Sequence, residues 1–153
     1  GNAGILGPIS IDAASVSDPV LIKASGQVLY TFASSVDDAD MGVTDIVRGA
    51  DLLASTPRQI WLQRCLGYPT PRYAHLPVAA NPAGEKLSKQ TRAAALDVAQ
   101  APALLVQALS FLGQAVPAAL CRAPLAEVWA WALAHWSFAA IPRQPRIMLD
   151  SAG

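Results

Sequence analysis

The chain has 153 residues, of which 53% are hydrophobic and 14% are charged, and its 11 basic and 11 acidic residues give a formal net charge of zero. This composition excludes a disordered chain, and the neutral balance excludes a general field that would attract nucleic acid or an anionic membrane. Two cysteines and two histidines, with no CxxC pair, indicate neither a zinc site nor a disulfide framework. We expect a reduced, cytoplasmic protein in which any RNA contact is local.

The N-terminal region begins without a regular pattern. Residues 1–17 are rich in Gly, Ala and Ser and show no periodicity, which is typical of a loose or cut end. Residues 20–22 and 27–29 flank a glycine turn and predict two short strands. Residues 30–36 have helical spacing and predict a helix.

A strand is predicted next at residues 43–47, where β-branched residues alternate with others. We expect it to be buried and to deliver Arg48 at its carboxyl end. Ligands of open α/β sheets bind at that end of the strands, and an arginine there can hold a carboxylate. On the residues alone, a surface ion pair of Arg48 is the competing interpretation.

A helix and a further strand complete a strand–helix–strand unit. Thr56 is the predicted N-cap of a helix that reaches residue 66 and is stopped by Gly67. Residues 75–79 predict the next strand, and its His75 is expected to be structural. This order is typical of a parallel sheet.

The loop after that strand carries Lys86, Ser88 and Lys89 behind a glycine-led turn at residues 81–84. Two ammonium groups and a hydroxyl on such a turn supply several donors to a triphosphate whose charge must be held as pyrophosphate leaves. Because a KxSK string is more often a solvated surface turn, the pattern alone leaves both interpretations open.

Two packed helices are predicted at residues 102–112 and 124–138, where apolar residues recur at helical spacing. Their predicted core positions are Leu104, Leu105, Ala108, Leu109 and Leu112 in the first helix, and Leu125, Val128, Trp129, Ala132, Leu133 and Trp136 in the second. Because Glu127 and His135 interrupt the apolar segment, we expect a packed helix there and not a membrane span.

Three features occur in order along the chain: Tyr30 ahead of an acidic pair at residues 37–38, the block GVTDIVRGADL at residues 42–52, and the loop GEKLSKQ at residues 84–90. This arrangement resembles the later part of the catalytic domain of class I glutamyl-tRNA synthetases. In this resemblance, residues 86–90 correspond to the KMSKS loop of that family.

The resemblance implies an α/β fold and a domain organisation. Residues 18–96 correspond to the second half of a class I synthetase Rossmann-like catalytic domain, and the likeness continues more weakly to residue 147. A small helical region is expected at residues 97–153, and residues 1–17 are left as the loose or cut N-terminal segment.

Within the family, the chain is most similar to the truncated paralogues, the glutamyl-queuosine tRNA(Asp) synthetases. Its loop has their KLSKQ form, ending in Gln90, and the sequence after the loop is too short for the anticodon-binding domains of a full-length enzyme. The resemblance implies an enzyme that activates glutamate with ATP, without needing tRNA for that step. The enzyme then transfers the glutamate to queuosine in the anticodon of tRNA(Asp).

The resemblance also implies roles for five side chains. Tyr30 and Arg48 match the glutamate-binding tyrosine and arginine of the family. Lys86 and Lys89 are the implied catalytic lysines of the loop, and Lys89 and Ser88 are the implied ATP contacts. The chemistry fits, because an arginine fork suits a carboxylate and a lysine can neutralise charge that moves onto phosphate. No residue of this chain is implied as a metal ligand.

The first half of the family pattern has no match in this chain: neither a HIGH-like motif nor a Cys-containing zinc insertion is present. Zinc is therefore expected only in that N-terminal half. Because adenylate formation needs the phosphates held from both sides, we expect little or no activity from this polypeptide alone. An expressed or proteolysed fragment, a gene remnant and one half of a split protein are the open explanations.

The expected partners are glutamate, ATP, tRNA(Asp) and the N-terminal half, with no membrane. The alternative function is a non-catalytic RNA-binding or protein-binding module derived from a glutamyl-tRNA synthetase. The neutral charge weighs against strong RNA binding by such a module.

Overall fold

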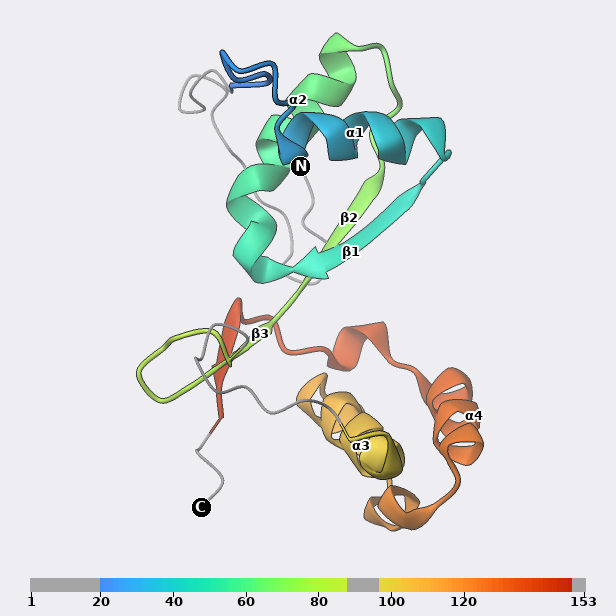
Figure 1. Cartoon of the computed structure of the whole chain (residues 1–153). Coiled ribbons are helices and arrows are strands. Elements are labelled where there is room, and N and C mark those ends of the chain that lie inside the picture. The colour runs from blue at the N-terminus through green and yellow to red at the C-terminus, as the bar shows by residue number, and fades with distance from the viewer. Residues whose placement is uncertain (1–19, 88–96, 150–153) are drawn as a thin grey trace. The chain divides into compact units, whose positions relative to one another are not determined.

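The computed structural model describes residues 20–87 and 97–149 (Figure 1). The chain divides into two compact units, residues 1–76 and residues 77–153. The first unit contains α1 (Tyr30–Asp40), β1 (Asp45–Gly49), a 3-10 helix (Ala50–Ser55), α2 (Thr56–Cys65) and β2 (Arg72–Leu76). The second contains β3 (Val78–Ala80), α3 (Ala101–Phe111), α4 (Leu125–His135), β4 (Arg146–Met148) and 3-10 helices at Val98–Gln100, Ala118–Arg122 and Phe138–Ala140. The predicted domain boundaries next to residues 17 and 96 involve residues outside the described ranges and stay predictions.

In the first unit, β1 and β2 are parallel neighbours connected through α2, which confirms the predicted strand–helix–strand order. The register places Ile46 opposite Tyr73 and Arg48 opposite His75. Because side chains alternate along a strand, these four residues share one face of the pair. Tyr73 and His75 are buried there, with exposed fractions of 6% and 0%. The same face therefore carries both the core of this unit and Arg48.

The predicted strand at residues 43–47 was wrong in its position and its burial. β1 begins at Asp45 and ends at Gly49, so Arg48 lies within the strand and not beyond its end. Val47 is 63% exposed because it lies on the face opposite to Tyr73. The β-branched residues do favour a strand, but only alternate positions of β1 point toward the buried face.

The observed end of α2 is close to the predicted end, but its N-cap differs from the predicted one. Thr56 is its first residue, and the N-cap position belongs to Ser55, which makes no side-chain cap. The predicted Thr56 cap was therefore wrong, because the Thr56 hydroxyl is used in contacts with the Leu52 carbonyl oxygen and His75. Gly67 ends the helix with a φ of 74°, a conformation that glycine adopts without steric cost.

Two further predicted elements differ in their limits. The helix predicted at residues 30–36 continues to Asp40 as α1. The strand predicted at residues 75–79 is two strands, β2 and β3, separated by Pro77, which has no N–H to donate to a ladder. The predicted pair of short strands near the N-terminus is a single antiparallel bridge between Ile22 and Val28.

The core of the second unit lies between α3 and α4, where Val106, Leu109, Val128 and Ala132 are buried. Both predicted helices are confirmed, but their predicted core positions are only partly correct. Ala108 is exposed, and the buried face of α3 includes Val106 instead. On α4, Trp129 and Leu133 are 51% and 81% exposed, so the apolar stripe is wider than the buried face. Within the described residues, no helix is long and apolar enough to span a membrane.

Candidate functional site

The guanidinium carbon of Arg48 lies 5.2 Å from the centroid of the Tyr73 ring, over its face. Arg48 is half-buried, and it makes no ion pair with any residue in the described ranges. Among the described residues, the charge is therefore supported by an aromatic face and not by a carboxylate. Such a guanidinium keeps its N–H donors for an anionic ligand.

The Tyr73 ring below Arg48 is fixed by buried neighbours. Its hydroxyl oxygen lies 3.3 Å from Nε2 and 3.4 Å from Oε1 of Gln63, a side chain of α2 that is 1% exposed. Burial raises the pKa of Tyr73 above its usual value, although the hydrogen bond from Gln63 and the charge of Arg48 act in the opposite direction. The hydroxyl thus stays protonated at neutral pH.

Tyr30, the second predicted glutamate contact, is the first residue of α1 and is 77% exposed. It belongs to the same unit as Arg48, and no hydrogen bond joins the two side chains within the part of the chain that the structure describes. Its exposure leaves the hydroxyl accessible to a ligand. Its predicted role stays a prediction.

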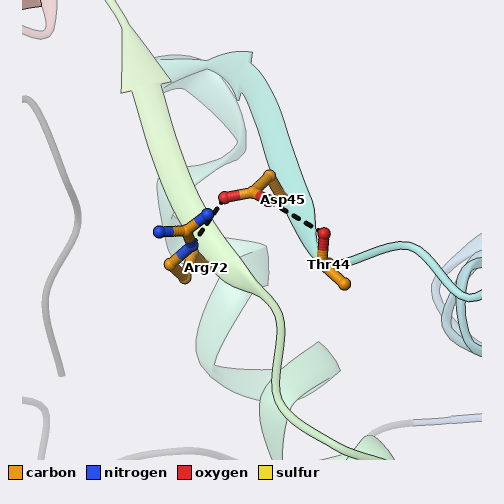
Figure 2. Close-up of polar contacts among 3 residues, drawn as sticks. All are labelled: Thr44, Asp45 and Arg72. Atoms are coloured by element: carbon orange, nitrogen blue, oxygen red, sulfur yellow. Dashed lines mark hydrogen bonds and ion pairs between the residues drawn. The ribbon is translucent and has the colours of Figure 1, made fainter.

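A second arginine of the first unit, Arg72, differs from Arg48 in having a carboxylate partner. Its Nε lies 2.7 Å from Oδ1 of Asp45, on the opposite face of the strand pair (Figure 2). The hydrogen bond from Arg72, and then that from the Thr44 hydroxyl at 2.9 Å, lower the pKa of Asp45 below its usual range. The same pair raises the pKa of Arg72. Asp45 is therefore engaged by Arg72 and not by Arg48.

The second unit holds the predicted phosphate loop, and its first turn is well ordered by hydrogen bonds. Asn81 Oδ1 accepts from the backbone N–H of Glu85 at 2.8 Å, and the Asn81 carbonyl accepts from Gly84 at 2.8 Å. Gly84 has a φ of 83°, and its carbonyl accepts from Arg146 Nη1 at 3.2 Å. Lys86 then pairs with Ala80 in an antiparallel bridge. The predicted glycine-led turn is confirmed.

The remaining predicted loop residues, Ser88 and Lys89, lie outside the described residues, as does Gln90. Lys86 is half-buried at the start of this segment. The ATP-binding roles of Ser88 and Lys89 and the catalytic roles of Lys86 and Lys89 stay predictions. In the described ranges, no three His, Cys, Asp or Glu residues form a group that could hold a metal ion.

Tyr73 and Gln63 were missed by the sequence reasoning. The predicted strand begins at residue 75, so it does not include Tyr73, which lies within β2 (Arg72–Leu76). The signal that could have found it is the alternation of Arg72–Leu76, in which Tyr73 and His75 point to one face. Gln63 offers no comparable signal, because a glutamine on a helix is normally exposed.

The chain is similar to known proteins both in sequence and in structure. A family model for the catalytic domain of class I tRNA synthetases (E and Q) matches residues 2–122. The chain is 66% identical over 136 residues to the Glutamyl-Q tRNA(Asp) synthetase of Dechloromonas aromatica. This match covers 89% of this chain and 45% of that relative. It is 58% identical over 141 residues to the protein of the same name from Aromatoleum aromaticum, covering 92% of this chain and 45% of that relative. The chain therefore spans less than half the length of these curated relatives.

Among solved structures, the glutamate-tRNA synthetase of Elizabethkingia anophelis matches with a TM-score of 0.67 at 23% identity. The match covers 95% of this chain and 33% of that chain. A glutamate tRNA ligase from Elizabethkingia meningosepticum matches with a TM-score of 0.65 at 20% identity, covering 98% of this chain and 33% of that one. At these identities the likeness establishes the fold.

Proposed function

Because the chain belongs to the family of class I tRNA synthetase (E and Q) catalytic domains, we propose that it is part of an enzyme that activates glutamate with ATP and transfers it to queuosine in tRNA(Asp). Family membership confirms the predicted α/β class I catalytic fold, and the predicted resemblance to glutamyl-queuosine tRNA(Asp) synthetases is confirmed. We propose queuosine in tRNA(Asp) as the acceptor because of the high sequence identity to the Dechloromonas relative. The complete reaction is proposed for a polypeptide of the relatives' full length.

Arg48 and Tyr30 are the proposed glutamate contacts. A carboxylate of glutamate fits a guanidinium that is half-buried and has no ion pair among the described residues. The Tyr30 hydroxyl would orient the amino acid through a hydrogen bond, for which its exposure at the start of α1 leaves access.

Lys89 and Ser88 are the proposed ATP contacts, and Lys86 and Lys89 are the proposed catalytic lysines. Adenylate formation joins a glutamate carboxylate oxygen to the α-phosphorus of ATP and releases pyrophosphate. The lysines would hold the negative charge that moves onto the leaving group, with Lys89 as the main contact. The hydrogen-bonded turn at residues 81–84 supports a role for Lys86, because the turn and the bridge to Ala80 hold the backbone that leads to this lysine. No covalent protein nucleophile is needed.

The acceptor would be queuosine in the anticodon of tRNA(Asp), and a tRNA substrate places the proposed activity in the cytoplasm. The neutral net charge of this chain means that it alone supplies no strong general attraction for the phosphates of RNA. We therefore assign the greater part of the tRNA contact to residues of the full-length polypeptide outside this chain.

The test is glutamate-dependent exchange of pyrophosphate into ATP, measured for the chain alone and for a fusion with the part of the Dechloromonas relative that the chain does not match. We expect exchange only in the fusion, with glutamate and not with aspartate. The fusion should glutamylate tRNA(Asp) that contains queuosine and leave tRNA(Asp) without queuosine unmodified. Full exchange by the isolated 153 residues would refute the proposed dependence on the rest of the polypeptide. A stable fusion that shows no exchange would favour the non-catalytic module.

A further inference from the structure

The contact between Arg48 and Tyr73 joins two strands diagonally. Tyr73 lies opposite Ile46 in the register, and Arg48 lies opposite His75. The Arg48 side chain therefore extends back along the strands to reach the ring, at 5.2 Å between its guanidinium carbon and the ring centroid. A long side chain can adopt several conformations, so a specific contact is needed to favour this one.

The ring that receives Arg48 has little freedom of its own. Tyr73 is 6% exposed, and its hydroxyl is within hydrogen-bonding distance of the buried Gln63 amide. The ring also stacks with that of His75, with 6.2 Å between the centroids and 11° between the planes. A buried ring that is held by Gln63 and His75 offers a fixed surface, and a guanidinium on it loses less entropy when it binds a ligand.

The contact with the ring leaves the hydrogen-bonding capacity of Arg48 intact. The guanidinium carbon lies over the face of the ring, and a cation–π contact of this kind uses the positive charge of the guanidinium without consuming an N–H donor. No ion pair within residues 20–87 and 97–149 occupies those donors. Those donors therefore remain suited to a bidentate contact with a carboxylate.

We propose that Tyr73 is a positioning residue that holds the guanidinium of Arg48 over its ring, so that the N–H donors of Arg48 are presented to the carboxylate of the amino-acid substrate. The proposal rests on the proposed role of Arg48 in binding glutamate. It adds that the aromatic face of residue 73, and not its hydroxyl, supplies the orientation. Tyr73 itself does not touch the substrate.

The first test observes Arg48 directly in the 153-residue chain by NMR. The Hε proton of Arg48, assigned by its loss in Arg48→Lys, should have a chemical shift set by the ring below it. We expect Tyr73→Phe to leave this shift nearly unchanged, whereas Tyr73→Leu and Tyr73→Met should move it toward the value of a solvated arginine. Tyr68→Leu, which removes another tyrosine of the same unit, should not move it. An unchanged shift in folded Tyr73→Leu or Tyr73→Met would overturn the proposal.

The second test measures kinetics in the full-length fusion. Tyr73→Leu and Tyr73→Met should raise the KM for glutamate about 3- to 30-fold with a smaller change in kcat and in the KM for ATP. Tyr73→Phe should retain the original KM. If the shift of Arg48 changes but the KM for glutamate does not, the positioning role is wrong. If the original fusion shows no dependence on glutamate at all, the proposed function fails while the NMR result stands by itself.

Discussion

The hydroxyl oxygen of Thr56 lies 2.8 Å from Nε2 of His75, and both side chains are buried. The contact joins the first residue of α2 to β2. The same hydroxyl lies 3.3 Å from the Leu52 carbonyl oxygen, which accepts from it. Whether Nε2 of His75 donates to or accepts from the Thr56 hydroxyl depends on the tautomer of the ring. His75 therefore has the structural role that the sequence predicts for it, as a buried connection between a strand and the helix that covers it.

Removing the Thr56 hydroxyl should destabilise the first unit. Thr56→Val keeps the shape of the side chain but takes a hydrogen-bond partner from the buried imidazole, which costs about 1–3 kcal/mol of unfolding free energy. Urea unfolding and hydrogen exchange of the α2 amides measure the loss. Thr44→Val is the matched control: its hydroxyl is exposed, bonded to Asp45, and its removal should change stability by less than about 0.5 kcal/mol. Equal effects would contradict a special role for the buried contact.

Local sequence signals predicted those parts of the fold that depend on local chemistry. Gly67 ends α2 because only a residue tolerant of positive φ continues the chain there, and the periodic apolar residues predicted α3 and α4. The features that the sequence did not predict depend on tertiary contacts. Thr56 does not cap its helix because its hydroxyl contacts His75, and Trp129 is exposed although it belongs to the apolar stripe of α4.

The candidate site, like the fold, was predicted from the sequence only in part. The order of Tyr30, Arg48 and the lysine loop is a property of the sequence, and it led to the family that the comparisons confirm. The contact of Arg48 with Tyr73 could not be predicted, because it depends on which residues of two strands lie diagonally opposite each other. One residue of error in the register would have placed Tyr73 on the other face.

The carboxyl group of Asp45 should titrate below its usual pKa of 3.8, because it accepts hydrogen bonds from Arg72 and Thr44. Arg72→Gln should move this pKa back toward 3.8, as followed by NMR titration of the side-chain carboxyl carbon. Since the folded-state pKa is lowered, the stabilisation is present above the unfolded-state value and is lost as the pH falls through the folded-state value. Arg64→Gln, at the exposed end of α2, should leave the Asp45 titration unchanged. A similar shift in both variants would argue against the specific pair.

Alkaline pH should destabilise the first unit through Tyr73. Burial raises the folded-state pKa of Tyr73 above 10.0, so the folded protein holds this proton more strongly than the unfolded chain does. Its stabilising contribution is complete below the unfolded-state pKa and decreases as the pH rises toward the folded-state value. Tyr73→Phe should reduce the loss of unfolding free energy above about pH 10, whereas Tyr68→Phe should show the same loss as the unsubstituted protein. The same alkaline profile in all three proteins would rule out Tyr73 as the source.

Lys89→Ala should lower pyrophosphate exchange by the fusion about 100-fold or more, because a preorganised charge that stabilises the leaving phosphates would be lost. Lys23→Ala serves as the control, since Lys23 lies exposed in the turn between Ile22 and Val28 and is not assigned to the site. Its exchange rate should match that of the original fusion. If Lys89→Ala retained full exchange, the loop would not be the ATP contact proposed here.

Gly113→Ala should be among the most damaging single substitutions in the second unit. Gly113 has a φ of 75°, and a Cβ there would overlap the backbone carbonyl oxygen of Ala140. Next to it, the Gln114 amide donates to the Ser137 carbonyl at 2.9 Å and accepts from the Ser137 N–H at 2.8 Å, so the backbone cannot move aside without breaking these bonds. Gly42→Ala has the same type of φ, at 68°, but no atom within 4 Å of the added Cβ. Thermal or urea unfolding should show a loss of about 1–2 kcal/mol for Gly42→Ala from backbone strain alone, and about 4 kcal/mol or more for Gly113→Ala. Equal losses would mean that positive φ accounts for both and that the close approach to Ala140 costs nothing.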